Sequence, residues 1–177
     1  MKRSLYLSVL IVSHCLGLCL LLLGCGKERP PGQAWAPDFK LTTLEGDEVA
    51  LSGLKGKVVL LDFWATWCAP CREAIPHLID LHRTFGQNGL EVIGMNVDQG
   101  DRETVLRFVK SMDIPYPILI TPDEVQRKYG VVSLPTTLLV DREGKIRQKF
   151  LGFTSEISKR LTATVEELTA EKPPKSN

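Results

Sequence analysis

Two cysteines that are two residues apart directly follow a continuous apolar segment, and this junction restricts the fold more than any other feature of the chain. The segment Val58–Trp64 is apolar except for Asp62, as expected for a central strand that is covered on both faces. A helix is predicted after Cys68 and Cys71, because apolar residues recur there at helical spacing: Ile75, Leu78, Ile79 and Phe85. A cysteine pair between a strand and a helix indicates a redox-active dithiol.

The predicted position of Cys68 at the start of a helix gives the pair its chemistry. Backbone N–H groups at a helix N-terminus stabilise negative charge, so that such a cysteine ionises with a pKa near ~7 instead of ~8.5 and attacks as a thiolate. Cys71 lies one turn further and is close enough to attack the resulting mixed disulfide and release the partner. We therefore expect Cys68 to be the nucleophile and Cys71 the resolving thiol.

The N-terminus has the composition of an export signal. Lys2 and Arg3 precede an apolar stretch over residues 5–23, which is also close to the ~20 residues that span a bilayer, so an uncleaved transmembrane anchor is the alternative. The sequence Leu22-Leu23-Gly24-Cys25 resembles the lipobox of bacterial lipoproteins, in which the cysteine is lipidated and becomes the first residue. Both interpretations keep the domain anchored to the membrane of the cell envelope, on the extracytoplasmic (periplasmic) side.

The predicted organisation is a signal peptide (1–24), a Pro- and Gly-containing tether (25–35), one α/β domain (36–171) and a disordered tail (172–177). Within the domain, a hairpin is expected at residues 39–43 and 49–51. The expected order of further elements is strand 58–64, helix, strand 90–97, helix 102–112, strand 116–121, short helix 123–129, strands 136–140 and 145–151, and helix 155–170 capped by Ser155. This order predicts a central sheet flanked by helices, with at least one parallel crossover.

Cysteine usage and charge exclude several classes of protein. Of the five cysteines, Cys15 and Cys19 lie in the apolar leader and Cys25 is the lipidation candidate, so a disulfide-stapled scaffold is not expected. The chain has 22 basic and 21 acidic residues, a balance that gives no support for nucleic-acid binding.

The sequence resembles the thioredoxin family, and within it the membrane-anchored TlpA/ResA-like branch, over roughly residues 35–170. The matching segments are Ala36-Pro37-Asp38-Phe39, Leu54-Lys55-Gly56-Lys57, the run from Asp62 to Cys71, Tyr129-Gly130-Val131 and Leu134-Pro135-Thr136-Thr137. The resemblance implies a thioredoxin fold with a central mixed sheet, and the extra helix and strand between Asp98 and Thr121 are typical of this branch.

The same resemblance assigns roles to residues around the dithiol. Pro135 is implied to be a cis-proline that faces the cysteines and binds substrate backbone together with Leu134 and Trp67; a trans proline before a strand is the alternative. Asp62 stands where thioredoxin has an acid that exchanges protons with the buried cysteine, although TlpA-like relatives more often have asparagine. An Asp at a partly solvated strand position is the alternative interpretation.

Other uses of the cysteine pair fit the residues less well. A structural zinc site lacks a second cysteine pair, and covalent haem attachment needs a histidine where Arg72 stands. A peroxiredoxin needs Pro and Thr where this chain has Leu61 and Ala65. The alternative of a different class is a thioredoxin-fold binding or chaperone module whose dithiol does not turn over.

We therefore expect an extracytoplasmic thiol–disulfide oxidoreductase that needs no metal and no cofactor beyond the Cys68–Cys71 disulfide. The resemblance implies a reductant of exported proteins, such as apocytochrome c, that takes electrons from a membrane thiol carrier. A monomer is expected, with no nucleic-acid partner.

Overall fold

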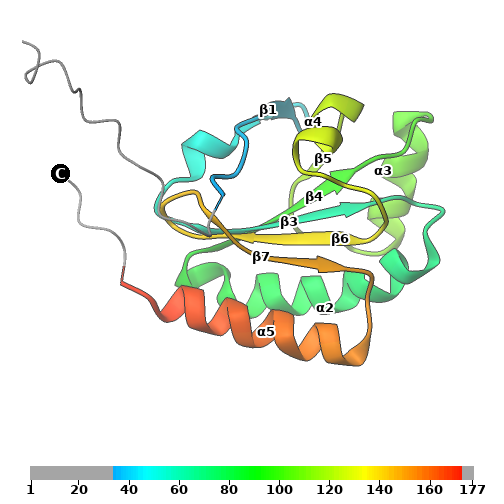
Figure 1. Cartoon of the computed structure of the whole chain (residues 1–177). Helices are drawn as coiled ribbons and strands as arrows, with labels where there is room; N and C mark the ends of the chain where they lie inside the picture. Colours follow the sequence, from blue (N-terminus) through cyan, green and yellow to red (C-terminus); the bar gives the residue numbers. More distant parts are fainter. Residues whose placement is uncertain (1–33, 173–177) are drawn as a thin grey trace, which may run out of the picture. The chain divides into compact units, whose positions relative to one another are not determined.

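Five strands form the central sheet, in the order β5-β4-β3-β6-β7 (Figure 1). They are β3 (Val58–Trp64), β4 (Leu90–Asn96), β5 (Ile118–Ile120), β6 (Thr136–Val140) and β7 (Ile146–Leu151). Strands β3, β4 and β5 run parallel, whereas β6 is antiparallel to β3 and β7 is antiparallel to β6. The predicted mixed sheet is confirmed, and the apolar segment that precedes the cysteines is its central strand.

The computed structural model describes residues 34–172. The predicted signal peptide, the lipidation candidate Cys25 and all of the tether except residues 34 and 35 lie outside the described residues, as does the tail from residue 173 onward. Among the described residues, no helix combines the length and the apolar character needed to cross a bilayer.

Strand β3 is central because its side chains supply both hydrophobic layers of the domain. All seven of its residues are buried. Successive side chains of a strand point to opposite faces, so that Leu60 and Trp64 belong to one core cluster and Leu61 and Phe63 to the other. Burying both faces of one strand explains why its sequence is apolar at every position except Asp62, instead of alternating.

Helices α2 (Ala69–Phe85) and α5 (Ser155–Ala170) cover one face of this sheet (Figure 1). Helix α3 (Arg102–Ser111) contributes Val105 and Val109 to the core cluster that contains Leu60 and Trp64. The other face carries α4 (Asp123–Lys128), the hairpin of β1 (Lys40–Thr42) and β2 (Glu48–Ala50), and the short 3-10 helix η2 (Leu51–Leu54). A second 3-10 helix, η3 (Gly86–Asn88), leads from α2 into β4. The extra helix and strand expected between Asp98 and Thr121 are α3 and β5.

The N-terminal cap of α5 differs from the prediction. Thr154, not Ser155, caps the helix: its Oγ1 accepts a hydrogen bond of 3.2 Å from the backbone N–H of Ile157. Thr154 has extended backbone angles (φ −146°, ψ 166°), which a capping residue requires, while Ser155 is already the first helical residue. Both side chains suit a cap, so the backbone conformation decides between them.

Candidate active site

Cys68 and Cys71 lie at the junction of the β3 loop and helix α2, joined by a disulfide with an S–S distance of 2.02 Å. Cys68 is the N-cap residue of α2, and its Sγ accepts a hydrogen bond of 3.3 Å from the backbone N–H of Cys71. Pro70 lies in the first turn, where the proline nitrogen costs no intrahelical hydrogen bond. The helix N-terminus therefore directs a backbone donor at the sulfur of Cys68, as its predicted chemistry requires.

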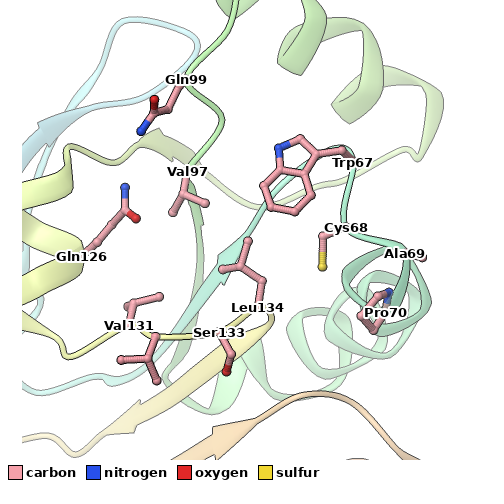
Figure 2. Close-up of a pocket in the computed structure, with 11 residues that line it drawn as sticks. Trp67, Cys68, Ala69, Pro70, Val97, Gln99, Gln126, Val131, Ser133 and Leu134 are labelled. Carbon is pink, nitrogen blue, oxygen red and sulfur yellow. The ribbon is translucent and has the colours of Figure 1, made fainter.

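A groove of about 700 Å³ opens beside Cys68. Figure 2 shows Trp67, Cys68 and Pro70 on one side of it and Val131 and Gln126, from the segment around α4, on the other. Its apolar lining consists of Trp67, Ala69, Pro70, Val97, Val131, Val132 and Leu134. Trp67 is 67% exposed, so a large apolar surface next to the reactive sulfur is available to a bound partner.

The two cysteines differ in their access to this groove. Cys68 lines it, whereas Cys71 is completely buried among the side chains of the core cluster on the α2 face. Cys68 keeps 5% of its surface exposed and borders the groove, whereas none of the surface of Cys71 is exposed.

Asp62 is buried in the middle of β3, with 1% of its surface exposed. Its side chain points to the same face as Leu60 and Trp64, the face on which Cys71 is packed. Thr137 on β6 is its partner in the strand register and donates a hydrogen bond of 2.9 Å from Oγ1 to Asp62 Oδ1. Burial raises the pKa of Asp62 to about 7, and the Thr137 hydrogen bond acts in the opposite, lowering direction. The interpretation of Asp62 as a partly solvated strand residue is wrong.

Asp98, just after β4, holds the loop that carries the cysteines. Its carboxylate accepts hydrogen bonds from the backbone N–H and the hydroxyl of Thr66, each 2.9 Å long. The buried Asn96 side chain donates a third hydrogen bond of 2.7 Å to Asp98. Because Thr66 is two residues before Cys68, these contacts fix the loop that leads into the N-terminus of α2.

The sequence-predicted residues come together only in part. Trp67, Cys68 and Leu134 line the groove, and the peptide bond between Leu134 and Pro135 is cis. Asp62 and Cys71 lie behind it in the core, and Cys25 is outside the described residues. Within residues 34–172, no three His, Cys, Asp or Glu side chains are grouped so that they could hold a metal ion.

Several polar residues of the site were not identified from the sequence: Thr137 and Asp98 behind the groove, and Gln99, Gln126 and Ser133 in its lining. Asp98 carried a usable signal, because parallel strands β3 and β4 end at the same edge of the sheet and a polar residue after either strand lies near that edge. Thr137 lies in the Leu134-Pro135-Thr136-Thr137 segment that carries the resemblance, but only the register of β6 against β3 places it opposite Asp62.

Comparisons with known proteins agree with this geometry. The AhpC/TSA family model matches residues 32–149. The thiol-disulfide oxidoreductase ResA of Bacillus thuringiensis is 40% identical over 118 residues, which cover 66% of this chain and 68% of that protein. ResA of Bacillus subtilis is 35% identical over 160 residues, covering 88% of this chain and 89% of that protein.

Solved structures of similar fold include proteins that are named for thiol–disulfide exchange. The crystal structure of a thiol:disulfide interchange protein of the thioredoxin family from Chlorobium tepidum superimposes with a TM-score of 0.71 and 26% identity, over 80% of this chain and 100% of that one. The expected thioredoxin fold is thereby confirmed. The chain belongs to the AhpC/TSA family and, within it, to the thiol-disulfide oxidoreductases related to ResA, with Cys68 and Cys71 as its redox pair.

Proposed function

We propose that the protein reduces disulfides of exported proteins, with Cys68 as the nucleophile and Cys71 as the resolving thiol. The observation that carries this assignment is the unequal access of the two sulfurs: Cys68 lines the groove and Cys71 is completely buried. The N-cap position of Cys68 adds to it, because the helix N-terminus favours a thiolate at that sulfur.

The proposed reaction has two displacement steps. The Cys68 thiolate attacks one sulfur of the substrate disulfide, the substrate S–S bond breaks, and the leaving thiolate takes up a proton. Cys71 then loses its proton and attacks Sγ of Cys68, which forms the Cys68–Cys71 disulfide and releases the second substrate sulfur as a thiolate. Two electrons pass from the dithiol to the substrate, and the product is the oxidised state that the structure contains.

Asp62 is the proposed proton acceptor for Cys71. A carboxyl group with a pKa of about 7 is ionised in a substantial fraction of molecules near neutral pH and can take up a proton there. Its position on the α2 face of the sheet, within the layer that buries Cys71, supports this role.

The proposed setting is the outer side of the cytoplasmic membrane, with a lipid on Cys25 as the anchor. Apocytochrome c is the proposed substrate, and an integral-membrane thiol carrier is the proposed electron donor that returns the oxidised pair to the dithiol. These assignments rest on the resemblance of the chain to the TlpA/ResA-like branch. Membrane attachment supports the exchange with such a carrier by raising the effective concentration of the two partners.

Trapping of mixed disulfides tests the cysteine roles. Reduced Cys71→Ser should accumulate a disulfide-linked complex with an oxidised substrate protein, because Cys68 can attack and nothing resolves the product. Cys68→Ser, the matched control, should accumulate far less. Non-reducing gels measure both, and equal trapping by the two variants would overturn the assignment. A second assay is the reduction of insulin disulfides: if Cys68→Ser still reduces insulin, the assignment of Cys68 as the nucleophile is wrong.

A further inference from the structure

Two glutamines of the groove beside Cys68 are hydrogen-bonded through their side-chain NH₂ groups: Gln99 donates one bond of 3.5 Å to Asp123, whereas Gln126 donates two, of 3.0 and 3.3 Å. None of the eleven residues that line the groove carries a formal charge, and apart from Cys68 the polar side chains among them are Gln99, Gln126 and Ser133. Gln99 and Ser133 are exposed, whereas Gln126, on α4, is half-buried. Gln126 therefore differs from Gln99 and Ser133 in that part of its surface is packed against the domain.

The hydrogen bonds of Gln126 determine which end of its carboxamide faces the groove. Its Nε2 donates to the backbone oxygen of Thr121 at 3.0 Å and to Oδ1 of Asp123 at 3.3 Å. Both partners are acceptors, so the NH₂ group must face them and Oε1 must face away. Figure 2 shows the oxygen directed from α4 into the groove, toward the side where Trp67 and Cys68 lie.

The side-chain oxygen of Gln126 is a hydrogen-bond acceptor without a donor among the described residues. No hydrogen bond among the described residues involves Gln126 Oε1, whereas both protons of its NH₂ group have partners. An acceptor in this largely apolar groove loses water when a substrate covers it, and the loss is compensated only if the substrate provides a donor. A substrate that places an apolar side chain there leaves the oxygen unpaired.

We propose that Gln126 determines substrate specificity by accepting a hydrogen bond from an uncharged donor, a hydroxyl or an amide, on a side chain close to the reactive cysteine of the substrate. The proposal rests on the function proposed above, in which the substrate lies in this groove. The donor is uncharged because no acidic residue lines the groove and the neighbouring carboxylate, Asp123, already accepts hydrogen bonds from Gln126 and Gln99; burying an unpaired charge is more costly than burying a hydroxyl.

Peptide pairs that differ by one hydroxyl test the proposal. Each peptide contains one cysteine, linked as a mixed disulfide to a chromophoric thiol, and has Thr or Val at one position within three residues of that cysteine. The reduced native protein should cleave the Thr peptide about 3- to 10-fold faster than the Val peptide at one of these positions, the range of one neutral hydrogen bond. The measured quantity is the ratio of kcat/KM values.

Gln126→Met keeps the length of the side chain and removes the acceptor, so the Thr to Val ratio should fall to about 1. The matched control is Gln87→Met on η3, an exposed glutamine outside the groove, which should keep the native ratio. Because the ratio is internal to each variant, a smaller fraction of active protein does not alter it.

Three results would overturn the inference: equal cleavage of Thr and Val peptides at every position, a native ratio in Gln126→Met, or faster cleavage of Lys peptides than of Thr peptides. A native protein that cleaves none of the peptides while Cys71→Ser traps nothing would instead refute the proposed function. The two failures are therefore distinguishable.

Discussion

The chemistry of Asp62 depends strongly on its surroundings. In an unfolded chain its carboxyl group has a pKa of 3.8, and burial in the folded protein raises the pKa to about 7. The folded state therefore holds this proton more tightly than the unfolded state does. The resulting contribution to stability is fully present below pH 3.8 and is lost as the pH rises through about 7.

Replacing Asp62 by Asn should remove the loss of stability that ionisation of the buried carboxyl group causes at high pH. We expect the free energy of unfolding of oxidised Asp62→Asn to exceed that of the native protein by about 2–4 kcal/mol at pH 8 and to show no such gain near pH 4. Urea denaturation at the two pH values, with the disulfide intact, measures the difference. An equal effect at both pH values would contradict a raised pKa.

Turnover should change in the opposite direction, because Asp62→Asn removes the proposed proton acceptor for Cys71. The rate should fall near neutral pH and lose its step near pH 7. Thr137→Val is the informative companion: it removes the hydrogen bond that lowers the pKa of Asp62, so the step should move to higher pH. A pH–rate profile that is unchanged in Asp62→Asn would leave the carboxyl group without a role in turnover.

At the scale of elements, the turn between β6 and β7 joins several segments through one side chain. The guanidinium of Arg142, which is buried, donates to the backbone oxygens of Gly56 at 2.8 Å, Asn88 at 3.3 Å and Thr169 at 3.0 Å. These oxygens belong to the loop before β3, to η3 and to the last turn of α5. The arginine thereby satisfies a carbonyl at the C-terminus of α5, where intrahelical donors are missing.

Arg142→Leu should lower the free energy of unfolding by about 2–4 kcal/mol, because it leaves three carbonyl oxygens in a partly buried site without this donor. Arg83→Leu, an exposed arginine on α2, is the control and should change stability by less than about 0.5 kcal/mol. Thermal or urea unfolding measures both. If the two variants unfold alike, the hydrogen bonds of Arg142 do not stabilise the fold.

At the scale of the whole described domain, its first residues and its groove lie at opposite ends of the sheet. Ala34 and Ala36 make backbone hydrogen bonds of 2.9 Å with Ile146 and Gly144, beside the turn between β6 and β7. Cys68 follows the other end of β3, since β6 runs antiparallel to β3 (Figure 1). The chain therefore enters the described domain at the end of the sheet that is remote from the groove.

Attachment through Cys25 makes a prediction for the full chain. Labelled fatty acid should enter the native protein and not Cys25→Ala, because the variant lacks the thiol that we propose as the lipidation site. Cys19→Ala, in the apolar leader, is the matched control and should remain labelled. Labelling that survives in Cys25→Ala would reject the lipobox interpretation, and an intact Met1 in the purified protein, found by mass spectrometry, would support an uncleaved transmembrane anchor.

The central strand, the helix that follows it and the redox pair between them could be predicted from sequence patterns alone. These features are local: an apolar run, a helical repeat and two cysteines one turn apart are all contained in Val58–Trp64 and the residues up to Phe85. The order of strands and helices likewise determined the fold class, because few arrangements satisfy it.

The surroundings of the cysteine pair depend on contacts between segments that are far apart in the sequence. Asp62 meets Thr137 across 75 residues of chain, because the register of β6 against β3 sets that contact. Gln126 turns its oxygen into the groove because the carbonyl of Thr121 and the carboxylate of Asp123 hold its NH₂ group. Thr154 caps α5 instead of Ser155, since the backbone angles of the incoming loop select the residue. Each of these outcomes depends on how separate segments are placed in space, which local sequence patterns do not specify.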